Sequence, residues 1–380
     1  MKYYLDHNAT TPVCDEALDE MEVCLSMFHG NASSLHAAGA RARERIENAR
    51  GIIARLIGAK PKEIVFTSGG TESNNAAIFA GSARSLCVSA VEHKSVLRAL
   101  ERSIVGASRY IAPVDADGLV DLGAVEDSIE SSGKDCLVSI MHANNETGVI
   151  QPILEISDIV RDHRGCLLHV DACQSFGKIP VNVDDLGVDM MTISAHKIGG
   201  PKGVGALYIR SGVGFYPFIV GGHQESDRRG GTENVAGIAG FGAAAAARCG
   251  NLTDYALTTK AHRFGLLHYL REGLDGIHLN GGHVERIPNT LNVGFAGVQS
   301  EALVMMLSER GIYVSNGSAC ESGSILGSHV LKAMGQSEEE SESAIRFSFG
   351  MDLEEGAVPF IAENVIECVM SLRSMADVPF

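Results

Sequence analysis

Uninterrupted apolar runs recur along the chain between about residues 60 and 210. They begin at residues 63, 85, 136, 166, 190 and 205 and read EIVFTS, SLCVSAV, CLVSIMH, CLLHVDA, MMTISA and GALYI. Strands that are covered on both faces have such continuous runs, whereas a strand with one face in water alternates apolar and polar residues. The pattern therefore predicts six buried strands of one central sheet.

Helical patterns lie between these runs, over residues 71–84, 94–104 and 154–164. This alternation of strand and helix predicts an α/β fold with a mostly parallel, doubly wound sheet and helices on both faces. The stretch VAGIAGFGAAAAA at 235–247 consists of small and apolar residues. It is too short to span a bilayer, so we expect a tightly packed internal helix.

The pattern changes after about residue 260. Residues 263–276 predict an amphipathic helix, and residues 289–297 and 344–350 predict half-buried strands. We expect a smaller α+β domain here, so that residues 15–258 form the large domain and residues 1–14 join 259–380 in the small one. The acidic SEEESES at 337–343 predicts a solvated loop or the start of a helix.

Charge and cysteine content narrow the functional classes. The chain has 380 residues, with 31 basic and 47 acidic side chains and a net charge of −16, which argues against nucleic-acid and anionic-membrane partners. No apolar run approaches the ~20 residues of a membrane span, and the first residues contain no apolar signal segment. Nine cysteines without a C-x-x-C pair predict neither a disulfide framework nor a metal site, and fit the reducing cytoplasm.

Polar residues directly follow several of the predicted strands, at the sheet edge where α/β proteins bind ligands. After the first run comes TSGGTESN. Gly69 and Gly70 would allow a sharp turn, and Thr71 or Ser73 would cap the next helix. The free N–H groups of such a helix start can bind a phosphate, although an ordinary strand-to-helix turn has the same pattern.

An acid and a lysine follow two further strands. Asp171 comes directly after CLLHV, and Lys197 comes after MMTISAH, at the same predicted edge of the sheet. Asp171 by itself also fits a helix cap. A phosphate seat, a buried acid and a lysine amine are together what pyridoxal 5'-phosphate requires, so we expect that cofactor.

Longer motifs, in this order along the chain, make the sequence resemble the cysteine desulfurases of the IscS/NifS group, which are fold-type I pyridoxal-phosphate enzymes similar to class-V aminotransferases. The motifs are YLDHNATTP, TSGGTESN, EHK, MHANNETGVIQP, HVDACQ, SAHKIGGPKGVGALY, RRGGTENV, SNGSACESGS and IRFSFG. They extend over nearly the whole chain. The resemblance implies a homodimer with active sites at its interface.

The resemblance also implies roles for the matching residues. Lys197 would bind the cofactor as a Schiff base, Asp171 would pair with its pyridinium nitrogen, and Gln174 would hydrogen-bond its ring hydroxyl. His93 would stack on the ring and move protons. The phosphate would be held by Gly70, Thr71, Ser194, His196 and, from the neighbouring subunit, Thr232. Asn145 and Arg346 would bind the substrate carboxylate.

Cys320 is the implied sulfur acceptor. Eight of the fourteen residues at 315–328 are Gly or Ser, which predicts an exposed loop around it. Its thiolate would attack the sulfur of L-cysteine, giving L-alanine and a Cys320 persulfide. The sulfur would then pass to an acceptor such as an iron–sulfur scaffold protein.

Other functions stay open on the sequence. A selenocysteine lyase, or another fold-type I lyase or aminotransferase, would share most of these residues. A non-catalytic sulfur-transfer scaffold is the alternative of another class, and the presence of both Lys197 and Cys320 argues against it. The pathway that uses the sulfur, whether iron–sulfur assembly, tRNA thiolation or thiamin synthesis, also stays open.

Overall fold

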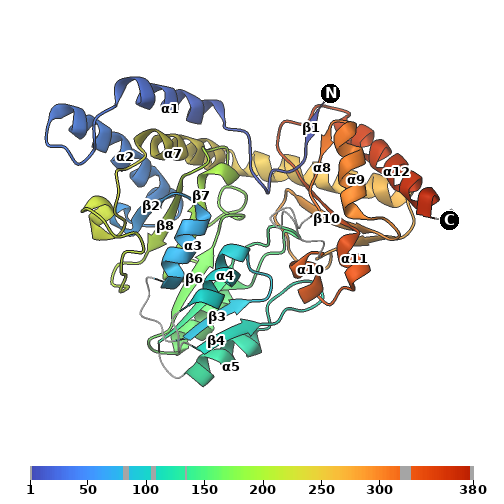
Figure 1. Cartoon of the computed structure of the whole chain (residues 1–380), viewed down its shortest axis with the longest axis horizontal. Coiled ribbons are helices and arrows are strands. Elements are labelled where there is room, and N and C mark those ends of the chain that lie inside the picture. The colour runs from blue at the N-terminus through green and yellow to red at the C-terminus, as the bar shows by residue number, and fades with distance from the viewer. Residues whose placement is uncertain (1, 80–84, 104–107, 133–134, 317–326, 377–380) are drawn as a thin grey trace.

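The structure is a computed structural model that describes residues 2–79, 85–103, 108–132, 135–316 and 327–376 (Figure 1). Its larger sheet has seven strands in the order β2-β8-β7-β6-β5-β3-β4. Their bounds are β2 Ile64–Thr67, β3 Ser85–Ser89, β4 Ser108–Ala112, β5 Cys136–Met141, β6 Leu167–Asp171, β7 Met190–Ser194 and β8 Gly205–Ile209. All six expected strands are present, and β4 is an additional edge strand whose more exposed residues lack the apolar run.

The sheet is mostly parallel, as expected. Only β8 runs against its neighbours: it pairs antiparallel with both β7 and β2. A two-strand antiparallel return needs no crossover helix, which explains why GALYI follows the β7 strand after only a short glycine-rich turn.

Helices cover both faces of this sheet (Figure 1). Alternate residues of each strand enter two different cores, so that Ile64 and Phe66 of β2 pack in one and Val65 packs in the other. This explains the uninterrupted apolar runs. Helices α3 (Gly70–Phe79) and α4 (Lys94–Arg102) cover one face; the other is covered by α2 (Ala37–Leu56), α5 (Leu122–Ser132), α6 (Ile153–Asp162) and α7 (Val235–Gly250).

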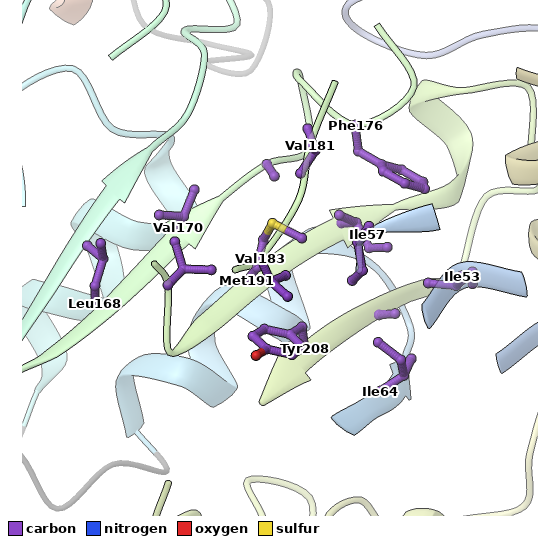
Figure 2. Close-up of a cluster of buried hydrophobic side chains, with 14 of the residues drawn as sticks. Ile53, Ile57, Ile64, Leu168, Val170, Phe176, Val181, Val183, Met191 and Tyr208 are labelled. Atoms are coloured by element: carbon purple, nitrogen blue, oxygen red, sulfur yellow. The ribbon is translucent and has the colours of Figure 1, made fainter. Parts of the chain in front are cut away.

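Figure 2 shows part of the core on the α2 side of the sheet, where Ile53 of α2 and Ile57, directly after that helix, lie beside side chains of β2, β6, β7 and β8. Helix α1 (Asp15–Met27) packs on α7. Helix α7 is an internal helix, as predicted: most of its small residues are buried, and a Cβ on Gly242 would come within 2.8 Å of the Ala49 side chain.

A separate core fills the second part of the chain, which includes the N-terminal strand β1 (Tyr3–Tyr4) paired with β11 (Ile312–Tyr313). Its three-stranded antiparallel sheet has the order β12-β10-β9. The elements are α8 Leu252–Gly273, β9 Ile277–Leu279, β10 Thr290–Phe295, α9 Ser300–Glu309, α10 His329–Ala333, α11 Glu338–Glu342, β12 Ala344–Ser348 and α12 Ala357–Ala376. The division at residues 14 and 258 stays a prediction, and α8 runs through the second point.

The expectation of half-buried strands at 289–297 and 344–350 is wrong. Every residue of β10 and β12 is buried. Apolar side chains on one face pack with α8, α9 and α12, while polar ones on the other contact the loop after β5: Asn292 donates to the Glu146 carbonyl. The polar face of these strands is buried because its side chains form hydrogen bonds with other protein groups and not with water.

Three further points concern local structure. Residues 338–342 form the short helix α11, capped by Ser337. Within the described ranges, no helix is long and apolar enough to cross a membrane. Short 3₁₀ helices lie at Pro61–Glu63, Ala195–Lys197 and Gln224–Asp227.

Candidate active site

A cavity of about 310 Å³ opens at the carboxyl ends of the central parallel strands. Ten of the residues predicted from the sequence line it: Gly70, Thr71, His93, Asn145, Asp171, Gln174, Ser194, His196, Lys197 and Arg346. They come from six separate segments of the chain. The cavity is also lined by residues that the sequence did not single out: Asn8, Ala9, Asn74, Ser95, Met141, Ala143 and Cys173.

Lys197 reaches the cavity from the 3₁₀ turn after β7. Its Nζ donates to the backbone carbonyl of Asn8 at 2.6 Å and to that of Ala9 at 2.9 Å. The N-terminal segment is held there because Thr11 donates to the His196 carbonyl through both its backbone N–H, at 2.9 Å, and its hydroxyl, at 3.0 Å. The lysine amine is therefore fixed by a segment that lies far away in sequence.

Asp171 ends β6 at the floor of the cavity and is buried. Its Oδ1 accepts from the backbone N–H of Cys173 at 2.9 Å, and its Oδ2 accepts from the Asn74 amide at 2.7 Å. Both donors are neutral, and within the described ranges Asp171 forms no ion pair. A buried carboxylate without a cation stabilises a positive charge placed beside it.

The turn from β2 into α3 forms one wall. Gly69 has φ of +148° and permits the sharp change of direction. The prediction that Thr71 or Ser73 caps the helix is wrong, because α3 already begins at Gly70. The Ser73 hydroxyl instead bonds the Thr67 hydroxyl at 2.7 Å inside the turn.

Ser194, at the end of β7, lies beside this turn: a Cβ on Gly70 would come within 3.8 Å of the Ser194 Cβ. Its Oγ is buried and has no hydrogen-bond partner within the described residues. A buried hydroxyl without a partner is costly, and a ligand oxygen would satisfy it. The start of α3 and this hydroxyl together form a polar end of the cavity.

Two histidines border the cavity in a neutral form. Burial, together with the charge of Lys197 beside it, lowers the pKa of His196 to about 4. Burial also lowers the pKa of His93, against the opposing effect of Asp171. The Nδ1 of His93 accepts the backbone N–H of Ser95 at 3.1 Å, so its proton resides on Nε2.

Arg346 of β12 closes the cavity from the second part of the chain. One Nη donates to Asp6 at 2.6 Å and the other to the Asn145 carbonyl at 3.0 Å. Its Nε is buried and has no partner among the described residues. These contacts fix the guanidinium plane and leave N–H donors unused beside Asn145.

Among the described residues, one predicted site residue does not line this cavity. Thr232 is exposed and lines a separate hollow of about 120 Å³, together with Arg229 and Glu225. Cys320 lies outside the described residues.

With the geometry established, comparison with known proteins gives a consistent result. The class-V aminotransferase family matches residues 3–358. A protein named cysteine desulfurase IscS from Dictyoglomus turgidum is 43% identical, over 98% of this chain and 96% of its own length. Another of that name from an Anaeromyxobacter species is 44% identical, over 98% of this chain and 94% of its own.

This chain belongs to the cysteine desulfurases of the class-V aminotransferase family. A solved NifS-like protein superposes with a TM-score of 0.90 at 37% identity, covering 98% of this chain and all of that one. The NifS-like protein of Rickettsia africae gives 0.87 at 35% identity with the same coverage. The resemblance and the fold class inferred from the sequence are thus confirmed.

Among the residues of this cysteine desulfurase site that the sequence did not single out, Asn8 has the most contacts with the predicted ones. Its carbonyl accepts from both Lys197 and Gln174, and its side-chain amide donates to the Asn145 carbonyl at 3.2 Å and to Thr290 at 2.8 Å. It lies in the YLDHNATTP motif, but no local pattern indicates that this loop crosses the sheet edge. Only the contacts reveal its role.

Proposed function

We propose that this protein is a pyridoxal-phosphate-dependent cysteine desulfurase that converts L-cysteine to L-alanine and a persulfide on Cys320. The observation that carries the proposal is the convergence in one cavity of Lys197, the unpaired buried carboxylate of Asp171 and the glycine start of α3. These three come from different strands. Membership in the cysteine desulfurase family gives the same activity.

The described residues fit pyridoxal phosphate. The buried Ser194 hydroxyl has no partner and lies at the polar end of the cavity with the start of α3, where a phosphate would satisfy both. Asp171 would hold the ring nitrogen in its protonated form, since it has only neutral donors of its own. When bound, this cofactor supplies an electron sink for carbanion chemistry at the substrate α-carbon.

Lys197 would hold the cofactor through its amine and then carry the α-proton. Its two bonds to backbone carbonyls keep Nζ within the cavity. The neutral His93 on an adjoining wall would donate the proton that it carries on Nε2, since its Nδ1 is occupied by the Ser95 N–H, and would later take a proton back there. Gln174 would donate from its amide to the ring oxygen. His196, Gly70 and Thr71 would contact the phosphate.

Arg346 and Asn145 would bind the substrate carboxylate. Asp6 and the Asn145 carbonyl orient the guanidinium, and its buried Nε needs an acceptor. A carboxylate of the substrate provides one, as a charge-assisted hydrogen bond. The pair with Asp6 also balances the arginine charge while no substrate is bound.

Cys320 would take the sulfur. Its thiolate attacks the substrate sulfur, the C–S bond breaks towards the α-amino acid, and a proton on the product carbon completes L-alanine. The Cys320 persulfide then transfers its outer sulfur to an acceptor protein such as an iron–sulfur scaffold. We expect this chemistry in the cytoplasm; the eight cysteines described by the structure are all free thiols.

We further propose a homodimer with Thr232 reaching the phosphate bound by the partner subunit. Thr232 is exposed and away from the cavity of its own chain. Large apolar side chains are exposed on and after α1 (Leu25, Met27 and Leu35) and before Thr232 (Tyr216 and Val220). Exposed apolar side chains of this size support burial by a second copy.

The test of the activity measures alanine release from L-cysteine and maps the persulfide by mass. We expect Cys320→Ala to form alanine at less than about 1% of the wild-type rate, since the substitution removes the thiolate that would attack the substrate sulfur. Cys249→Ala, at a half-buried cysteine remote from the cavity, is the matched control and should keep its rate. Alanine release by Cys320→Ala at the wild-type rate would overturn the assignment of Cys320.

Two further outcomes separate the alternatives. Borohydride should trap the cofactor on Lys197 in the wild type and in Lys202→Ala, at an exposed lysine of the same turn, but not in Lys197→Ala. An unlabelled wild type would favour the non-catalytic scaffold. Turnover confined to L-selenocysteine would favour the lyase, and pyruvate formation without alanine would favour another fold-type I reaction.

A further inference from the structure

A second lysine lies beneath the candidate active site, where the proposed mechanism has no use for it. Lys178 is only 1% exposed and is among the largest fully buried side chains. It follows β6 in the same turn as Gln174 but does not line the cavity. Lysine is almost never fully buried unless it has specific partners, so its contacts need an explanation.

Its partners are two amide oxygens. The Nζ of Lys178 donates to Oε1 of Gln174 at 2.6 Å and to Oδ1 of Asn8 at 2.8 Å. Within the described ranges it forms no ion pair with a carboxylate. The chain thus buries an amine solely to engage two neutral side chains that both border the cavity.

These contacts determine which way the Gln174 amide faces. Nζ of Lys178 donates to the Gln174 atom beside it, which is the oxygen. The Asn8 carbonyl can only accept, so the Gln174 atom beside it, at 2.9 Å, must be the nitrogen. The amide orientation follows from both partners, and the second N–H of Gln174 stays available on the cavity side.

The arrangement does not require a charged lysine. Burial lowers the pKa of Lys178 well below its ordinary value, and the neighbouring cations Lys197, Arg248 and Arg346 lower it further, with Cys173 opposing them. A neutral amine still has two N–H donors, enough for both oxygens. The other titratable groups that sense its charge are His7 and His196.

We propose that Lys178 is a positioning residue: it fixes the Gln174 and Asn8 amides so that Gln174 presents an N–H donor, and not an oxygen, to the ring oxygen of the cofactor. The inference rests on the proposed function. Without Lys178, Oε1 of Gln174 loses its donor, whereas Oδ1 of Asn8 keeps the Asn289 amide at 3.1 Å, so it is the Gln174 amide that can rotate. An oxygen turned towards the cofactor's ring oxygen would repel it.

The test compares Lys178→Met, which keeps the volume and removes the donors, with the wild-type holoenzyme. A donor at the ring oxygen stabilises its negative charge, so its loss favours the protonated form of the Lys197–cofactor adduct. We expect the pKa of that adduct, read from visible absorbance against pH, to rise by about one unit, and the cofactor dissociation constant to rise about tenfold. Lys62→Met, at an exposed lysine, should change neither.

A double substitution distinguishes positioning from general damage. If Lys178 acts through Gln174, then Lys178→Met combined with Gln174→Ala should titrate as Gln174→Ala does by itself. Should Lys178→Met fail to fold, the adduct is titrated in Lys178→Gln, by itself and combined with Gln174→Ala. The new amide keeps N–H donors but has a shorter reach than lysine.

Two results would overturn the inference. One is a Lys197–cofactor adduct in Lys178→Met with the same pKa as in the wild type. The other is a double variant in which the pKa changes caused by Lys178→Met and by Gln174→Ala add together. A wild type that forms no adduct contradicts the proposed function and this inference together, whereas either of the first two results contradicts this inference alone.

Discussion

Glu92, beside the proposed ring-stacking His93, is fully buried and forms no ion pair with a described residue. Its Oε1 accepts from the Ser89 hydroxyl at 2.6 Å and from the backbone N–H of Met141 at 2.9 Å, while Oε2 has no partner among the described residues. Burial raises the pKa of Glu92 to about 8, and the nearby charge of Asp171 adds to the rise. The carboxyl is therefore protonated in the folded protein at neutral pH.

A raised pKa makes stability depend on pH in a definite direction. The folded state holds the Glu92 proton between the unfolded pKa of 4.5 and about 8, so the free energy of unfolding falls as pH rises through this window. Glu92→Gln keeps the shape and removes the ionisation. Near pH 5, we expect the variant to unfold at the same temperature as the wild type. At pH 9 it should unfold at a higher temperature than the wild type, with a free energy of unfolding larger by roughly 5 kcal/mol at most.

Thermal unfolding at the two pH values measures this. Glu101→Gln, at an exposed carboxylate of α4, is the control and should follow the wild type throughout. Equal loss of stability in Glu92→Gln and the wild type between pH 5 and 9 would show that Glu92 is ionised in the folded state.

At the level of elements, the close approach of β8 to the β2–α3 turn shapes the polar end of the cavity. Gly205 pairs with Thr67, and a Cβ at this position would come within 2.7 Å of the Gly69 Cα and 2.9 Å of the Ile193 carbonyl oxygen. Both neighbours are backbone, which cannot rotate away. The glycine thus permits the antiparallel return of β8 directly beside the turn that starts α3.

Gly205→Ala should therefore displace the turn at Gly69 and Gly70. We expect a loss of about 1–3 kcal/mol in the free energy of unfolding, together with weaker cofactor binding. Gly51→Ala is the matched control: Gly51 lies inside α2 with no atom within 4 Å of its Cβ position, and alanine there should stabilise by up to about 1 kcal/mol. Denaturant unfolding and a cofactor titration measure both, and wild-type values for Gly205→Ala would contradict the steric argument.

At the level of the whole molecule, the loop that carries Thr232 is tied firmly to the larger part of the chain. Glu225 accepts from both Nη atoms of Arg50, at 2.6 and 2.8 Å, and Arg229 pairs with Glu72 of α3 at 3.0 Å. Glu225 and its two successors have φ between +48° and +65°, a strained run that these bonds offset. Thr232 is consequently presented to solvent at a fixed place.

We expect the purified protein to sediment as a dimer, and Thr232→Ala to raise the cofactor dissociation constant about tenfold without dissociating it. The cause would be the loss of one hydrogen bond to the partner's phosphate. Thr253→Ala, at an exposed threonine of α8, should leave the constant unchanged. A monomer with normal cofactor affinity would remove the basis for the shared site.

The sequence by itself determined the local features of this protein. Continuous apolar runs gave the buried strands, because each strand packs on both faces, and polar residues after those runs gave Asp171 and Lys197 at the edge of the sheet. The order of motifs gave the family. The roles assigned to these residues, and that of Cys320, stay predictions.

Only the tertiary structure decided the contacts between distant segments. Lys197 and Lys178 both bond to Asn8, more than 160 positions away, and Arg346 pairs with Asp6 across 340. It also decided that β10 and β12 are buried on both faces and that β8 returns antiparallel. The pattern of apolar and polar residues predicts whether a segment faces water or the protein interior. It does not predict which segments contact one another, because those contacts depend on the packing of the whole chain.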